Sequence, residues 1–87
     1  MTSKYSIFLS LDEDRFRECL SESNWPVRHL AMAVGSSERT LYRAMSDGKI
    51  PISLALSICM TLGSDVEDVF GRQDPELMDV LRNVIFS

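Results

Sequence analysis

Two short amphipathic segments separated by a glycine occupy the middle of the chain, within residues 27–46. In the first segment, Leu30, Ala31 and Val34 recur at helical spacing and form one apolar face. Gly35 follows at the point where a helix end favours a left-handed backbone, which glycine adopts at the lowest cost. The pattern therefore predicts a short helix that ends in a tight turn at Gly35.

The segment after this turn predicts a second helix. Ser37 is expected to cap it by accepting a hydrogen bond from a free backbone N–H. One face of this helix is apolar and is formed by Leu41, Ala44 and Met45. The opposite face is cationic and hydrogen-bonding, and it carries Arg39, Tyr42, Arg43 and Ser46. Two helices joined by a tight turn, with one presenting such a stripe outward, are typical of a helix-turn-helix.

The pattern around this pair resembles the lambda-repressor-like (XRE or Cro-type) DNA-binding domains. The resemblance covers residues 15–71 and is carried by the segments L-A-x-x-V-G, S-x-R-T-L-Y-R, D-G-K and L-G-x-x-V-E-D-V-F-G. Ser36 departs from the family, which usually has an apolar residue in the turn. The resemblance implies an all-α domain of five to six helices, with helices two and three forming the helix-turn-helix and residues 10–71 forming the DNA-binding domain.

The resemblance also implies which side chains contact DNA. Four residues at the start and on the outer face of the third helix would read base edges: Glu38, Arg39, Tyr42 and Arg43. Four others would contact phosphates on either side: Arg28, Ser37, Lys49 and Ser53. Arginine binds guanine O6 and N7 with two donors, and glutamate accepts from cytosine N4. The alternative for these side chains is an ordinary solvated surface.

Residues 25–49, which include the predicted helix-turn-helix, carry a net positive charge, whereas the rest of the chain is acidic. The net charge is −4, although DNA affinity depends strongly on neutralising phosphates. Residues 25–49 nevertheless contain four basic side chains and two acidic ones, whereas the rest of the chain contains five basic and eleven acidic ones. This excess of positive charge is modest, so we expect DNA binding that weakens quickly with salt. An acidic protein-binding module has the same overall balance.

Residues 1–9 alternate weakly between apolar and polar side chains and predict an N-terminal arm or an edge strand packed on the domain. Pairing of this strand across a dimer is the alternative. Ser10 and Glu13 fit a capping box, which predicts that the first helix begins there. Within this helix Cys19 lies on the apolar face, and we interpret it, like Cys59, as a core residue.

Two more helices are predicted after the helix-turn-helix. Residues 50–51 are expected to lead into an apolar helix over residues 52–62, surrounded by neighbours except along a thin polar stripe formed by Ser53, Ser57 and Thr61. Gly63 ends this helix. Ser64 and Glu67 then fit a second capping box and predict a fifth helix that ends at Gly71.

The C-terminal segment, residues 72–87, predicts a sixth helix that begins at Asp74 and Pro75. Its apolar stripe comprises Leu77, Val80, Leu81 and Val84. A chain of 87 residues has a small core in which to bury such a stripe. The stripe therefore either packs on the domain or forms a dimer contact.

The sequence lacks the signatures of an enzyme: a glycine-rich phosphate loop, a nucleophile with a histidine partner, or a metal-ligand cluster. We therefore expect no enzymatic activity, cofactor, metal or small-molecule ligand. Two cysteines and the absence of a long apolar run predict a cytoplasmic chain without a membrane span. The expected function is sequence-specific regulation of transcription, by a repressor that binds a palindromic double-stranded operator as a homodimer. The alternative is a protein-interaction module, such as an inhibitor or an antitoxin-like partner.

Overall fold

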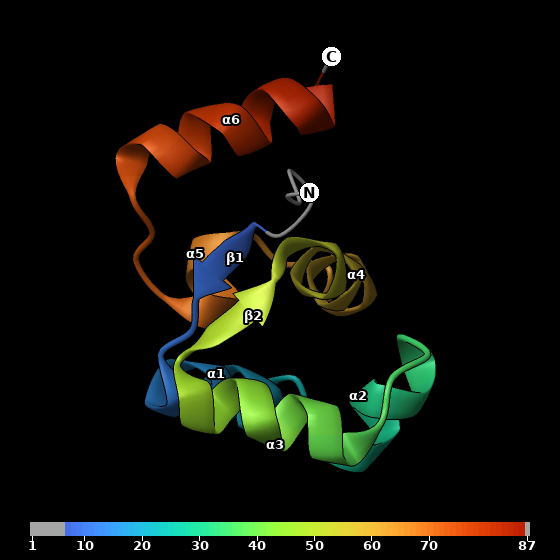
Figure 1. Ribbon diagram of the computed structural model, residues 1–87. Coiled ribbons are helices and arrows are strands. Elements are labelled where there is room, and N and C mark those ends of the chain that lie inside the picture. The colour runs from blue at the N-terminus through green and yellow to red at the C-terminus, as the bar shows by residue number, and fades with distance from the viewer. Residues whose placement is uncertain (1–6, 87) are drawn as a thin grey trace.

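A computed structural model describes residues 7–86, except for the side chains of residues 80–82 and 84–86. Over this range the chain forms six helices and one small two-stranded sheet (Figure 1). In chain order the elements are β1 (Phe8–Ser10), α1 (Glu13–Glu22), α2 (Val27–Ala33), α3 (Glu38–Asp47), β2 (Lys49–Pro51), α4 (Ile52–Leu62), α5 (Val66–Phe70) and α6 (Pro75–Phe86). The predicted all-α class, with up to six helices and a short edge strand, is confirmed.

The turn between α2 and α3 is fixed by backbone hydrogen bonds. Gly35 has a φ of +71°, as the sequence predicted for the residue that leaves the helix. The N–H of Ser36 donates to the carbonyl of Ala31 at 2.8 Å, and the N–H of Gly35 donates to the carbonyl of Met32 at 3.2 Å. These two bonds form a Schellman motif. Ser36 supplies only its backbone here, so its departure from the family pattern leaves the turn intact.

One hydrophobic core joins the helices. The predicted apolar face of α3, formed by Leu41, Ala44 and Met45, is confirmed as buried. On α1 the predicted core residue Cys19 is buried together with Phe16 and Leu20. The rings of Phe16 and Phe70 lie 5.4 Å apart between centroids and tie α1 to α5. Burial of these apolar side chains is the main favourable contribution to folding.

The two strands hold the N-terminal segment on the domain. β1 pairs antiparallel with β2, and Leu9 lies opposite Ile50, with both side chains fully buried. The expected edge strand is therefore part of the core. Its partner strand was not predicted, because the sequence indicated only a connection into the fourth helix. Three residues ending in a proline are too short to show a strand period.

Both predicted capping boxes are wrong. Ser10 lies on β1, and Asp12 caps α1 instead, with its carboxylate accepting from the backbone N–H of Arg15 at 3.2 Å. At α5 the cap position is occupied by Asp65, without a side-chain hydrogen bond. In contrast, the predicted start of α6 is confirmed, because Asp74 accepts from the backbone N–H of Glu76 at 2.9 Å.

Helix α4 has the predicted bounds but is not surrounded by neighbours. Its buried residues are Ala55, Ile58 and Cys59. Met60, on another side of the helix, is 83% exposed. The expectation that only the serine and threonine stripe lies near water is therefore wrong. The uniformly apolar sequence of this helix carried no signal for which side faces solvent.

Gln73 ties the segment before α6 to the sheet. Its side chain is buried, its Oε1 accepts from the backbone N–H of Ser10 at 2.8 Å, and its Nε2 donates to the carbonyl of Ser10 at 2.7 Å. The same Nε2 also donates to the carbonyl of Gly71 at 3.1 Å. The Gln73 side-chain amide thus forms, at the outer edge of β1, the two hydrogen bonds that a neighbouring strand would form with Ser10. At Ser10 this edge is consequently not free to pair across a dimer.

Gln73→Ala is expected to lower the free energy of unfolding by about 1–3 kcal/mol, because it leaves the backbone N–H and C=O of Ser10 without these partners. Urea denaturation measures the difference. Arg72→Ala is a matched control on the neighbouring exposed residue, where we expect a change of no more than about 0.5 kcal/mol. Equal effects of the two substitutions would contradict this role for Gln73.

Candidate nucleic-acid interface

Helix α3 presents its polar face to solvent because its apolar face is anchored in the core. Leu41, Ala44 and Met45 are buried, which fixes the rotation of the helix about its axis. The other face carries Arg39, Tyr42 and Arg43, all of them exposed. Tyr42 is 43% exposed despite its aromatic ring. The three side chains predicted to read bases are thus brought together on one accessible helix face.

The positive side chains of this region form no ion pair with the carboxylates that the structure describes. Within the described part of the chain, no carboxylate forms an ion pair with Arg39, Arg43 or Lys49, nor with Arg28 on α2. The arginines of α1 differ. Arg17 lies 2.9 Å from the carboxylate of Glu13, and Arg15 lies 4.0 Å from that of Asp68. An anion that approaches α3 therefore meets no competing intramolecular salt bridge.

Glu38 opens α3 and is exposed. Its carboxylate lies in the first turn, where the positive end of the helix dipole stabilises a negative charge. This local role accounts for an acidic residue at the start of α3. The same position would place the carboxylate at the front of α3, where it can accept from a base amino group.

Ser37 caps α3 as predicted. Its Oγ accepts from the backbone N–H of Thr40 at 3.1 Å, and it lies 2.8 Å from the Thr40 hydroxyl. When Thr40 donates this second bond, the Ser37 hydroxyl proton remains available to a phosphate oxygen. Sequence reasoning missed Thr40, although its position three residues after the cap is the signal that it can interact with Ser37.

Lys49 lies directly after α3 and begins β2. Gly48 between them has a φ of +73° and ends the helix. The Lys49 Nζ lies 5.3 Å from the centroid of the Phe8 ring, across the small sheet. Sequence reasoning missed Phe8, because only the strand pairing brings these two residues together.

Arg28 and Ser53 lie at the starts of other helices. Arg28 is exposed in the first turn of α2, and Ser53 is exposed in the first turn of α4. Ser53 is separated from α3 by the length of β2. Both side chains are accessible to a phosphate, and their contact with one stays a prediction.

The expected dimer stripe lies on α6. Leu77 is half-buried and packs against the core, whereas the side chains of Val80, Leu81 and Val84 lie outside the described residues. Figure 1 shows α6 and α3 on opposite sides of the molecule, with the sheet between them. This placement restricts which surfaces could join two copies of the chain if both α3 helices were to bind the same duplex.

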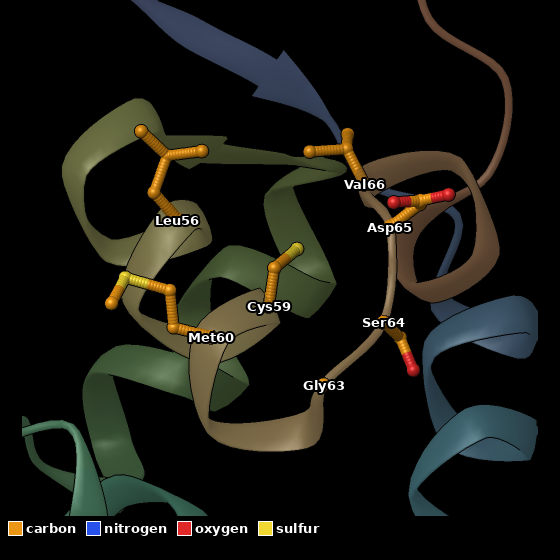
Figure 2. A pocket seen from close by; sticks show the side chains of 7 residues that line it. All are labelled: Leu56, Cys59, Met60, Gly63, Ser64, Asp65 and Val66. Carbon is orange, nitrogen blue, oxygen red and sulfur yellow. The ribbon is translucent and has the colours of Figure 1, made fainter. Parts of the chain in front are cut away.

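A hollow of about 310 Å³ lies between the end of α4 and the start of α5 (Figure 2). It is lined by Leu56, Cys59, Met60, Gly63, Ser64, Asp65 and Val66. Burial raises the pKa of the Cys59 thiol to about 12, and the nearby Asp65 carboxylate adds to this effect. Burial also raises the pKa of Cys19. Both thiols are therefore protonated at neutral pH and are poor nucleophiles.

Within the described part of the chain, no group of three or more His, Cys, Asp or Glu side chains is arranged to hold a metal ion. None of the helices described here is both long enough and apolar enough to cross a membrane. Comparisons of the chain with protein-family models, with curated proteins and with solved structures found no match.

Proposed function

We propose that this protein is a sequence-specific double-stranded DNA-binding regulator of the lambda-repressor-like type. The observation that carries the proposal is the exposed stripe of Arg39, Tyr42 and Arg43 on α3, whose arginines form no ion pair with a carboxylate of the residues that the structure describes. A tight turn and buried inner faces hold α3 rigidly against α2. A helix held in this way fits the major groove, which is about 12 Å wide.

The spacing of the arginines suits base readout. Arg39 and Arg43 are four residues apart on one face, so their Cα atoms are separated by about 6 Å along the helix axis. This distance corresponds to about two base-pair steps of 3.4 Å. Each guanidinium can donate two hydrogen bonds to a guanine, while Glu38 or Tyr42 contacts a neighbouring base.

Phosphate contacts would fix the register of α3 in the groove. We assign these contacts to Arg28 at the start of α2, to Ser37 at the start of α3, and to Lys49 and Ser53 beyond the end of α3. Such contacts position the protein without reading sequence. The excess of two positive charges within residues 25–49 is small, so specific binding depends mainly on the base contacts, and each phosphate contact adds about one charge to its salt dependence.

We propose that the regulator binds a palindromic operator as a homodimer and represses transcription by occupying a promoter. The two α3 helices must then face the same side of one duplex. A twofold contact through α6 alone would turn them in opposite directions, since α6 and α3 lie on opposite sides of the molecule. For such a dimer we therefore propose a contact surface that lies nearer to α3 than the outer side of α6 does. We place the protein in the cytoplasm, where free thiols persist.

Selection from a pool of random duplexes, followed by sequencing, tests the proposal. At about 100 mM salt, where non-specific phosphate binding is reduced, we expect enrichment of an inverted repeat. The centres of its half-sites should be about one helical turn apart. Failure to enrich any sequence, with folded protein and at lowered salt as well, would overturn the proposal.

A hollow lined by acidic groups between α1 and α5 favours a second candidate function. It measures about 260 Å³, and its lining includes the carboxylates of Glu18, Glu22 and Asp68, with Arg15 as the one basic side chain. Such a surface suits a basic protein, as expected for an inhibitor or antitoxin-like module. Glu18→Lys with Glu22→Lys would abolish capture of that partner under this second function, and would leave operator binding intact under the first.

A further inference from the structure

The outer face of the two-stranded sheet adjoins the end of α3. Leu9 and Ile50 point into the core and are fully buried. Side chains alternate along a strand, so their neighbours Phe8, Ser10, Lys49 and Pro51 lie on the outer face, and all four are exposed. Ser10 is opposite Lys49 and Phe8 is opposite Pro51, so Phe8 and Lys49 are diagonal neighbours. This diagonal is within reach of a ring and a long side chain.

Phe8 is the partner of the Lys49 ammonium. The Nζ atom lies 5.3 Å from the ring centroid, within the range of a cation–π interaction. Phe8 is 43% exposed, so the ring is not placed there by burial alone. The ring attracts the cation without neutralising it, whereas a carboxylate would cancel its charge. The ammonium therefore keeps its full charge for a second partner.

Backbone hydrogen bonds fix both residues relative to α3. The N–H of Leu11 donates to the carbonyl of Gly48 at 2.9 Å, next to the start of β2. At the other end, the N–H of Ile52 donates to the carbonyl of Ile7 at 2.9 Å. β1 is thus joined to the chain on both sides of Lys49. The Phe8 ring has a defined place beside the C-terminal end of the DNA-reading helix.

We propose that Phe8 is a positioning residue that holds the Lys49 ammonium at the edge of the α3 face for contact with a DNA phosphate. The inference rests on the proposed function and adds to it a residue outside the helix-turn-helix. A free lysine side chain loses rotamer freedom when it binds a phosphate. The ring restricts the side chain before DNA arrives, and such preorganisation strengthens binding.

A double-mutant cycle on the full chain tests this role, with the duplex obtained by selection as the probe. Phe8→Leu keeps an apolar side chain but removes the π-face, and it should weaken binding by about two- to fivefold. Phe8→Tyr keeps an aromatic ring and should bind with wild-type affinity. In the Lys49→Ala background Phe8→Leu should cause no further loss. Lys49→Ala itself should reduce the salt dependence of binding by about one charge.

NMR of the free protein gives a readout that a purely structural role would not move. The ring current of Phe8 should shift the ε-CH₂ protons of Lys49 upfield in the wild type and in Phe8→Tyr, and this shift should disappear in Phe8→Leu. Urea midpoints for each variant reveal any loss of fold separately. Wild-type protein without the upfield shift would overturn the proposal.

The cycle also separates this inference from the function on which it rests. If Arg39→Ala weakens operator binding while the effects of Phe8→Leu and Lys49→Ala simply add, only the positioning role of Phe8 is overturned. If the protein binds no duplex, or if Arg39→Ala has no effect on binding, the proposed function itself is overturned and the role of Phe8 falls with it. Coupling between Phe8 and Lys49, together with the upfield shift, supports the proposal.

Discussion

Arg39→Ala is expected to weaken binding to the selected operator by about 1–3 kcal/mol and to relax specificity at one base pair. The side chain is exposed, it has no ion-pair partner among the described residues, and the buried face of α3 holds it in place. Its removal would therefore delete the proposed base contact without disturbing the core. Fluorescence anisotropy against the operator and against single-base variants measures both effects.

Two further variants show whether charge or geometry is responsible. Arg39→Lys keeps the positive charge but loses the planar fork that binds guanine, so specificity should fall while the salt dependence stays unchanged. Arg72→Ala removes one exposed positive charge from the segment between α5 and α6, and it should leave operator affinity close to that of the wild type. If Arg72→Ala weakens binding as much as Arg39→Ala does, α3 is not the reading helix.

The helix-turn-helix was predictable because its signals are local. The apolar period of α3, the cap at Ser37 and the left-handed turn at Gly35 each lie within a few residues of the structure that they specify. The same period placed Arg39 and Arg43 on the outer face. The exposure of Arg39 and Arg43 therefore follows from their spacing relative to the apolar residues of α3.

The features that were missed depend on contacts between distant segments. Ser10 fits a capping box in sequence, yet its backbone pairs with Gln73, which lies 63 residues further along the chain. The cation–π contact of Lys49 needs the register of β1 against β2. The lack of an ion pair with Arg39 or Arg43 among the described residues is likewise a property of the folded chain. Local propensity contains no information on such pairings, and tertiary packing overrides it where the two conflict.

Phe16→Ala is expected to lower the free energy of unfolding by about 3–5 kcal/mol. Phe16 is fully buried, and its ring lies 5.4 Å from that of Phe70, so the substitution opens a cavity between α1 and α5. A domain of this size has a total stability of about 4–13 kcal/mol, at about 0.05–0.15 kcal/mol per residue. The substitution should therefore remove between about a quarter and all of this stability and give a much lower midpoint in urea.

Phe16→Leu provides the control, because it retains most of the apolar volume and should destabilise the domain much less than Phe16→Ala does. The two variants also separate folding from recognition. Phe16 lies on α1, away from the proposed DNA contacts, so Phe16→Ala should reduce operator binding only by the fraction of protein that is unfolded. A neutral stabilising osmolyte, such as sucrose, should restore binding by Phe16→Ala but not by Arg39→Ala. A Phe16→Ala protein as stable as the wild type would show that the contact between α1 and α5 does not hold the domain together.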